Sequence, residues 1–189
     1  MDQKLCLWDP TEVTCSNLIG HNGPISQVQI DDQNIAVSAS YDSSLLVWNL
    51  DTLESTNGLF NGHKDAVMQF AWANSLVVSG DRTGVIAFWD INRGEEPLRV
   101  VKGHASAVGK ICLHSDSENL VVTGGLRDGR VNVYDMRTSG TVKAAIVHKA
   151  AINMLTVGES GHLVTASADQ MVKKFDMRAG EGKNLHRIK

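Results

Sequence analysis

The sequence predicts an all-β fold built from a repeated unit of 40 to 45 residues. Aromatic residues recur at spacings of 40, 41, 45 and 41, at Trp8, Trp48, Trp89, Tyr134 and Phe175. Histidines recur at spacings of 42, 41 and 44, at His21, His63, His104 and His148. A repeat of this length has room only for a few short β-strands, and these cannot bury their apolar faces alone. The repeats are therefore expected to pack against one another.

The stretch 20–49 gives the clearest copy of the unit. After Gly20-His21, apolar residues alternate within 25–30 and again within 35–39, and the two runs are separated by Asp31-Asp32. Residues 40–44 have the composition of a tight turn, and 45–49 form a third short apolar run that ends in Trp-Asn. Each unit is therefore expected to begin with three short strands.

These features resemble the WD-repeat family of β-propellers, in which Gly-His and Trp-Asp dipeptides recur with this period. Three of the four histidines follow glycine, and only Val147-His148 departs from the pattern. The resemblance implies blades of four antiparallel strands, lettered a to d from the centre outward. It implies an all-β WD-repeat β-propeller with four blades plus a partial blade.

The resemblance divides the chain, read as one domain over 1–189, into a partial blade and four blades. The partial blade covers 1–20, and the blades cover 21–60, 61–102, 103–147 and 148–189, the last with a weak outer strand after Arg178. A seven-blade ring at roughly 42 residues per blade needs close to 300 residues, so an incomplete portion of such a ring is expected. A closed four-blade ring and a ring completed by two chains remain alternatives.

Composition restricts the cellular setting that we expect. No apolar run approaches the length of a membrane span, and no basic segment followed by an apolar one marks a signal peptide, so an intracellular protein, cytoplasmic or nuclear, is expected. Cys6, Cys15 and Cys112 are odd in number and far apart, and are interpreted as buried thiols. A net charge of -3 favours neither nucleic acid nor a membrane as partner.

His21, Ser40 and Asp42 have the composition of a hydrolase triad, but the set recurs as His148, Ser167 and Asp169 and, in part, as His104 and Asp128. Catalytic triads are not normally copied in every structural unit. The resemblance instead implies a buried hydrogen-bond network that also includes Trp48, and no enzyme activity. In the second blade Thr83 occupies the aspartate position and Asp81 the serine position, so His63 and Trp89 are expected to lack partners and this blade to be looser.

Cofactor and metal signals are weak. The histidines and cysteines show no close ligand spacing, and the glycines fall at strand turns rather than before a helix. No cofactor and no metal are expected.

The resemblance implies a partner-binding top face, formed by the loops where strand b ends and strand a begins. Its candidate residues are Tyr41, Lys64, Arg82, Arg127 and Lys149. A partly basic surface of this kind suits an acidic or phosphorylated segment of another protein. The alternative is that these are ordinary solvated loop charges.

A second motif follows the aromatic residues of two successive repeats, as Tyr134-Asp135-Met136-Arg137 and Phe175-Asp176-Met177-Arg178. It resembles the Trp-Asp-x-Arg motif by which WD-repeat substrate receptors dock onto the adaptor of cullin-RING ubiquitin ligases, although these residues could simply begin a loop. The leading hypothesis is a non-enzymatic protein-interaction scaffold within a multiprotein complex. A ligase substrate receptor is the alternative.

Overall fold

The computed structural model describes residues 3–9, 11–59, 62–93, 96–114, 120–137, 141–158, 161–177 and 184–188, and of 57–59, 141–146 and 184–188 it describes the backbone. Within these ranges the chain forms eighteen β-strands in five antiparallel sheets and no α-helix. No helix in the described part is long and apolar enough to cross a membrane.

A two-stranded sheet and four four-stranded sheets follow one another along the chain, and we call the four-stranded sheets blades one to four. The two-stranded sheet is β1 (Lys4–Asp9) with β2 (Thr14–Ile19). Blade one has β3 (Ile25–Ile30), β4 (Ile35–Ser40), β5 (Leu45–Asn49) and β6 (Glu54–Leu59). Blade two has β7 (Val67–Ala73), β8 (Leu76–Asp81), β9 (Val85–Asp90) and β10 (Arg99–Lys102).

Blades three and four repeat this order. Blade three has β11 (Val108–Leu113), β12 (Leu120–Gly125), β13 (Arg130–Asp135) and β14 (Thr141–Val147). Blade four has β15 (Ile152–Val157), β16 (His162–Ser167), β17 (Val172–Asp176) and β18 (Asn184–Ile188). In each blade every strand pairs with the next in the chain, so the four strands correspond to strands a, b, c and d.

Each apolar core lies between two neighbouring sheets. Val37 and Val47 of blade one pack with Phe70 and Trp89 of blade two in one such cluster. Further clusters join blades two and three, join blades three and four, and join the β1–β2 hairpin to blade one. The second strand of blades one to three is therefore buried on both faces apart from its half-buried first residue, and its sequence reads as a continuous apolar and small-residue run.

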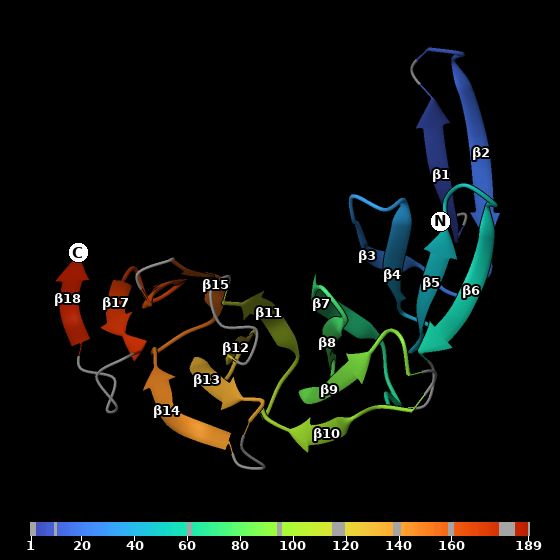
Figure 1. The fold of residues 1–189 in the computed structure, drawn as a ribbon. Coiled ribbons are helices and arrows are strands. Elements are labelled where there is room, and N and C mark those ends of the chain that lie inside the picture. Colours follow the sequence, from blue (N-terminus) through green and yellow to red (C-terminus); the bar gives the residue numbers. More distant parts are fainter. Residues whose placement is uncertain are drawn as a thin grey trace.

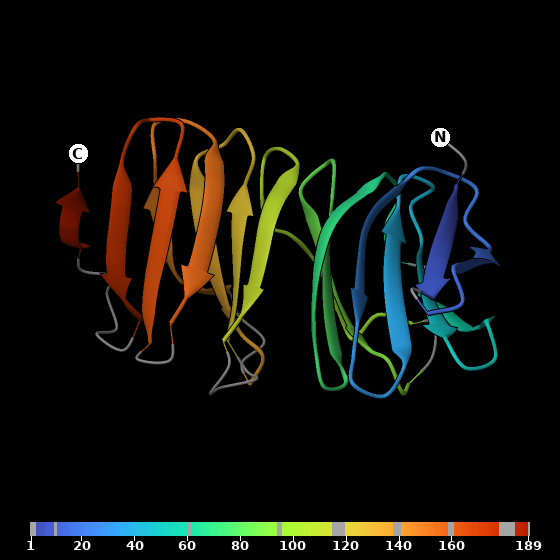
Figure 2. The ribbon, with the colours of Figure 1, turned by 90° about the horizontal axis from the view of Figure 1, so that it is seen from above.

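The five sheets form an open arc (Figure 1). The first strands β3, β7, β11 and β15 follow one another along its inner side, and each contacts the next. The hairpin and blade four lie at opposite ends, and the view from above shows the same separation (Figure 2). The described residues thus form the blade architecture of a propeller, and not a closed four-blade ring.

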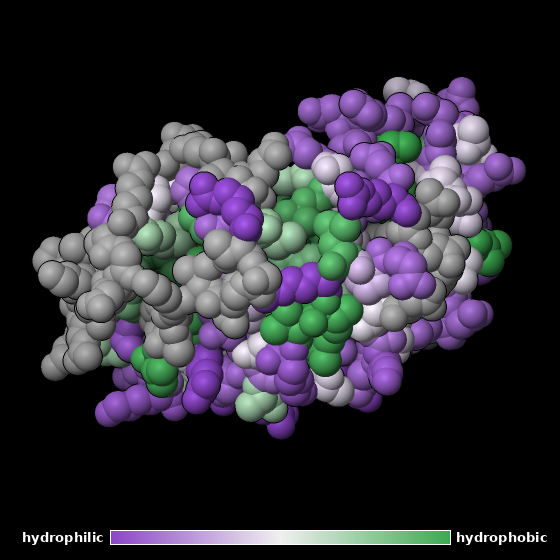
Figure 3. Space-filling model, turned by 60° about the horizontal axis from the view of Figure 1, so that its bottom comes forward, coloured by the Kyte–Doolittle hydropathy of each residue, from purple (hydrophilic) through white to green (hydrophobic). Residues whose placement is uncertain are grey.

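The surface is mostly hydrophilic, but it carries exposed apolar side chains. Figure 3 shows one face, on which apolar residues gather in the middle among hydrophilic ones. Leu98 and Val100, beside or on the outer strand β10, are 46% and 47% exposed. Val28 and Ile30 are 46% and 54% exposed. They lie on β3, the first of the strands along the inner side of the arc.

The interpretation of the cysteines as buried thiols is wrong for two of the three. Cys6 on β1 and Cys15 on β2 form a disulfide, and the Cys15 residue is exposed. Their strands pair with Trp8 opposite Cys15, which brings Cys6 diagonally within reach. Cys112 remains a free, half-buried thiol, and burial raises its pKa.

Candidate functional site

The ends of the strands define two opposite faces of the arc. Strand b ends and strand a begins on one face, which we call the b–c face because it carries the b–c turns. The a–b and c–d turns lie on the other face, which we call the a–b face. The repeated histidines belong to the b–c face, at the entry to strand a of each blade.

The histidine of blade one joins three segments of its blade. His21 Nδ1 lies 3.1 Å from Asp42 Oδ2, and His21 Nε2 lies 2.7 Å from Ser38 Oγ. The indole Nε1 of Trp48 donates to the same Ser38 oxygen at 2.8 Å. An indole N–H can only donate, so the Ser38 hydroxyl proton is left for Nε2 and His21 Nδ1–H donates to the carboxylate.

Ser40 does not contact His21, which corrects the expected network. Its Oγ donates to the carbonyl of Pro24 at 3.1 Å and accepts from the Asp42 amide at 3.1 Å. Trp48 pairs with Ala36 in the sheet, so Ser38 is its diagonal neighbour on the same face and Ser40 lies beyond reach. Ser167 of blade four has the same role as Ser40, because its Oγ donates to Ala150 O at 3.2 Å.

The expectation that blade two lacks the network is also wrong. His63 Nδ1 lies 3.2 Å from Asp81 Oδ2, and Nε2 lies 2.6 Å from Ser79 Oγ. Trp89 Nε1 donates to Ser79 Oγ at 2.8 Å. Asp81 stands at the end of strand b rather than in the turn, but its side chain reaches the same histidine atom, and Thr83 Oγ1 donates to its other oxygen at 2.8 Å.

Blades three and four use threonine instead of serine. His104 contacts Asp128 Oδ2 at 3.0 Å and Thr123 Oγ1 at 2.8 Å. His148 contacts Asp169 Oδ2 at 3.0 Å, and its Nε2 lies 2.8 Å from Thr165 Oγ1. The four blades therefore share a His–Asp pair and a hydroxyl, whereas the aromatic donor varies.

The hydroxyl that sequence reasoning missed has a clear signal in the sequence. It is the fourth residue of strand b in every blade: Ser38, Ser79, Thr123 and Thr165. All four are completely buried. A search at the histidine period for Ser or Thr inside the apolar run, rather than at its end, finds them.

Close packing explains why glycine precedes the histidine. A Cβ atom placed on Gly20 would lie 2.9 Å from a ring carbon of Trp48, and one on Gly62 would lie 2.5 Å from a ring carbon of Trp89. Real Cβ atoms do not approach other carbons this closely, so these rings require glycine. In blade four the aromatic residue is the smaller Phe175, and Val147 takes the place of glycine.

Burial and hydrogen bonding shift the pKa values of the network in one direction. Burial lowers the pKa of His21 and of His104, although the neighbouring aspartate opposes this in both cases. Burial raises the pKa of Asp81, but hydrogen bonds from His63 and Thr83 outweigh it and bring it to about 2. His21 and Asp42, whose pKa values are both lowered, are thus held as a neutral imidazole beside an ionised carboxylate.

These sites are built as structural units. The serine that contacts His21 is 0% exposed, so its oxygen cannot meet a substrate from solution. The described residues also contain no group of three or more His, Cys, Asp or Glu side chains that could hold a metal ion. Exposed side chains lie instead on the loops that the networks hold in place.

The network fixes the loops of the b–c face. The amide of Lys149 donates to Asp169 Oδ2 at 3.0 Å, and the amides of Asn22 and Ala105 make the equivalent bonds in blades one and three. The loop that enters strand a is thereby tied to the b–c turn. Tyr41, Lys64, Arg82, Arg127 and Lys149 all lie in these two kinds of loop, and all are exposed.

One of these candidate cations is already paired. Arg82 Nη2 lies 2.9 Å from Asp65 Oδ1, and 63% of the Arg82 side chain is exposed. Lys64, Arg127 and Lys149 form no ion pair with another described residue. Together these three place basic side chains from blades two, three and four on the b–c face.

The residues of the second motif lie on the a–b face. Arg137 donates to Asp135 through Nε at 3.1 Å and through Nη2 at 2.9 Å, while 68% of its side chain stays exposed. Asp176 ends β17 in the equivalent position of blade four. Arg178 lies outside the described residues, so the second copy of the motif is placed only in part.

The fold and the repeated network define a β-propeller protein built from sequence repeats. Residues 12–49 and 95–135 match the family described as "WD domain, G-beta repeat". The chain thus carries WD repeats at these two positions.

Similar sequences are WD-repeat and complex-associated proteins. "CCR4-associated factor 4 homolog" of Candida glabrata is 27% identical, over 82% of this chain and 31% of its own length. "Nuclear distribution protein PAC1" of Komagataella phaffii is 24% identical, over 94% and 39%. "WD repeat-containing protein 1" of Gallus gallus is 26% identical, over 81% and 26%. The chain thus spans between a quarter and two fifths of the length of these relatives.

Solved structures share the architecture. The computationally designed Ika8 protein superposes with a TM-score of 0.83 and 31% identity, over 98% of this chain and 56% of its own. The computationally designed Ika4 protein gives a TM-score of 0.74 with 28% identity, over 84% and 94%.

Proposed function

We propose that this chain is a non-enzymatic scaffold whose b–c face binds acidic or phosphorylated segments of partner proteins. Its relatives include "CCR4-associated factor 4 homolog" and "Nuclear pore complex protein nup43" of Dictyostelium discoideum, and these names support a protein-interaction role. The observation that carries the ligand class is the alignment of Lys64, Arg127 and Lys149 on one face, from three successive blades.

The chemistry of this face suits such a ligand. Arginine binds carboxylate or phosphate through two parallel hydrogen bonds, and lysine adds a point charge. The loops are held by hydrogen bonds to the network aspartates, so the cations are presented on a rigid frame. Because these loops are already ordered, binding of a flexible ligand costs less conformational entropy on the protein side.

Affinity purification with mass spectrometry tests the proposal. We expect the double variant Arg127→Glu/Lys149→Glu to lose partners that the wild type captures, and phosphatase treatment to remove the phosphorylated ones. A control with a charge reversal on the a–b face, Arg93→Glu, should keep them. Identical partner sets for all three proteins would contradict the proposal.

A ligase substrate receptor is a second candidate, supported by the geometry of Arg137. Its guanidinium is held by Asp135 and still mostly exposed, as a docking residue must be. Arg93 is a matched control, because it lies in the c–d turn of blade two at 3.5 Å from Asp90. If the candidate is correct, Arg137→Ala abolishes co-precipitation with the cullin-RING adaptor and Arg93→Ala does not. Equal recovery of the adaptor with both variants would reject it.

We further propose an intracellular location, cytoplasmic or nuclear. One relative is named as a nuclear distribution protein and another as a CCR4-associated factor homolog. Fluorescence microscopy of the tagged protein in its own cells tests this proposal, and accumulation in the secretory pathway would contradict it.

A further inference from the structure

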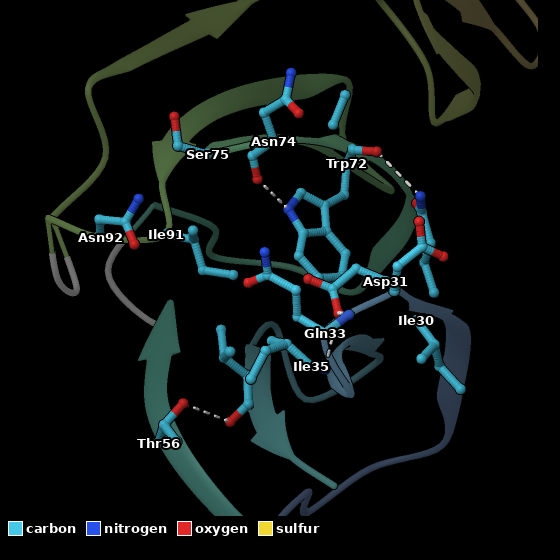
Figure 4. Close-up of a pocket in the computed structure, with 14 residues that line it drawn as sticks. Ile30, Asp31, Gln33, Ile35, Thr56, Trp72, Asn74, Ser75, Ile91 and Asn92 are labelled. Carbon is cyan, nitrogen blue, oxygen red and sulfur yellow. Dashed lines mark hydrogen bonds between the residues drawn. The ribbon is translucent and has the colours of Figure 1, made fainter.

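A hollow of about 800 Å³ lies on the a–b face between blades one and two. Its walls come from the β3–β4 turn and β5–β6 of blade one, and from the β7–β8 turn and the end of β9 in blade two. Figure 4 shows Ile35, Trp72 and Ile91 around its interior. The volume is in the range of sites that bind small ligands or short peptide segments.

The floor and the rim differ in chemistry. Trp72 is 9% exposed, and its Nε1 donates to the carbonyl of Asn74 at 2.8 Å, so the indole is fixed in the wall of the hollow. Ile35 and Ile91 line the same space (Figure 4). An apolar side chain of a ligand would therefore find an apolar place here.

The rim is acidic. Asp31 and Asp32 line the hollow, and its lining residues include no Lys, Arg or His. The amides of Gln33 and Ile35 both donate to Asp31 Oδ1, at 2.9 Å each, which fixes the carboxylate toward the hollow (Figure 4). Asp51 of the neighbouring c–d turn is held beside them by Asn34 at 3.0 Å.

The cation that follows Asn92 in the sequence is already paired with a carboxylate. Arg93, in the c–d turn of blade two, is paired with Asp90 at 3.5 Å. The rim therefore presents two carboxylates from one turn to a common space, with amide groups from Gln33 and Asn92 beside them. A cationic ligand group would gain a charge-assisted hydrogen bond in a partly desolvated position.

A second hollow of about 390 Å³ extends the first toward blade three. The two share Gln29, Trp72, Ala73 and Asn74, and the second is lined mainly by β3, β7 and β11, so together they lead from the a–b face to the inner side of the arc. An extended chain suits a surface of this length better than a compact ligand does.

We propose that this groove binds an extended segment of a partner protein in which a lysine or arginine neighbours an apolar residue. The apolar side chain occupies the space beside Trp72, and the cation reaches Asp31 and Asp32. This surface lies opposite the b–c face, and its preference for charge is the reverse of that proposed there.

Selection from a phage-displayed random-peptide library on the wild-type chain tests the inference, with the protein sparsely immobilised so that self-association does not interfere. Enriched peptides should carry Lys or Arg beside an apolar residue. Synthetic copies should bind the Asp31→Asn/Asp32→Asn variant about tenfold more weakly, as expected for the loss of charge-assisted bonds. Asparagine keeps the Oδ1 acceptor, so the turn is preserved. Gln33→Lys should weaken binding further, because it places a cation in the groove.

Asp65→Asn is the matched control, because it removes one carboxylate on the opposite face, where Asp65 pairs with Arg82. It should leave the affinity unchanged. Equal affinity for the wild type and the Asp31→Asn/Asp32→Asn variant would overturn the inference, as would enrichment without basic residues or no enrichment at all. Acidic peptides that lose binding to Arg127→Glu/Lys149→Glu would report on the b–c face instead.

Discussion

At the scale of single residues, each blade depends on one hydrogen-bonded histidine. Its two ring nitrogens have partners on different segments, a carboxylate from the b–c region and a hydroxyl from strand b. Since both are buried or half-buried, removal of either leaves a polar atom without a partner in a position that water does not readily reach.

We expect Asp81→Ala to destabilise the protein by ~1 to 3 kcal/mol, about as much as Asp42→Ala, because each change removes the partner of a buried histidine. Thr83→Ala should cost less, since Thr83 Oγ1 only donates to Asp81 and is not itself a partner of His63. Urea denaturation of the three variants measures this. A negligible effect of Asp81→Ala beside a large one of Asp42→Ala would mean that blade two lacks a working network.

The protein should lose stability on acidification below neutral pH. The pKa values of His21 and His104 are lowered in the folded state, mainly by burial, so the unfolded chain binds more protons as the pH falls below about 6.5. Asp81 and Asp169 have pKa values of about 2, and their contribution is lost only below about pH 4. The urea midpoint should therefore decline first between about pH 7 and 5 and again below about pH 4. A midpoint that stays constant in the first interval would contradict the histidine assignment.

The residues of the network could be predicted only in part. The histidine positions and three of the aspartate positions follow from the repeat period, but one repeat alone does not decide between Ser38 and Ser40, because both side chains face the same side of the strand. The cross-strand register with Trp48 decides it. Asp81 could not be placed either, because an acidic side chain at the strand end reaches the histidine as well as one in the turn does.

At the scale of elements, blades one and two are joined by side chains that bond to the neighbouring backbone. Gln27 Nε2 donates to Phe70 O at 2.9 Å, and the Phe70 amide donates to Gln27 Oε1 at 2.9 Å. Gln29 Nε2 donates to Trp72 O at 3.0 Å, and Ser26 Oγ to Val67 O at 2.8 Å. Strand β3 thus bonds to β7 through side chains, although the two belong to different sheets.

Gln27→Ala should destabilise the contact between these blades by ~1 to 3 kcal/mol, since it leaves both polar groups of Phe70 without their partner. Gln29→Ala removes a single bond and should cost about half as much. Hydrogen exchange at the Phe70 amide gives the local readout, and its protection should fall in Gln27→Ala but not in Gln29→Ala. Unchanged protection in both would show that the glutamine does not hold the amide.

The strands themselves were largely predictable, because short alternating runs between turn residues mark them. The run 45–49 is strand β5, and the expected partial blade is the β1–β2 hairpin. The outer strand of blade two is short, at Arg99–Lys102, and the amide of Leu98 before it donates to Phe88 O. The glutamine bonds between blades were not predictable, because nothing in one repeat reports the position of the next.

At the scale of the whole molecule, both ends of the arc present apolar side chains. Val28 and Ile30 alternate with the glutamines that face blade two, so they face the other way. Met154 on β15 of the last blade is 56% exposed. Such surfaces associate when nothing covers them. The interpretation as an incomplete portion of a larger ring stays a prediction.

We expect the isolated 189-residue chain to self-associate. Replacement of the exposed apolar residues at both ends, by Val28→Ser, Ile30→Lys and Met154→Lys, should shift it toward the monomer. Light scattering coupled to gel filtration measures the mass, and Val13→Ser, which changes a 69% exposed residue in the β1–β2 turn, is the control. A stable monomer of the wild type with a cooperative melt would contradict this expectation.

The histidine networks close within single repeats, whereas the glutamine bonds cross from one repeat to the next. Each His–Asp pair joins residues 18 to 24 positions apart, and the Gln27–Phe70 bonds join residues 43 positions apart. Duplication or loss of one entire repeat in the gene would therefore leave every network intact. Only the contacts at one junction would meet a new neighbour, so recombination can alter the number of blades while selection acts on a few residues at that junction.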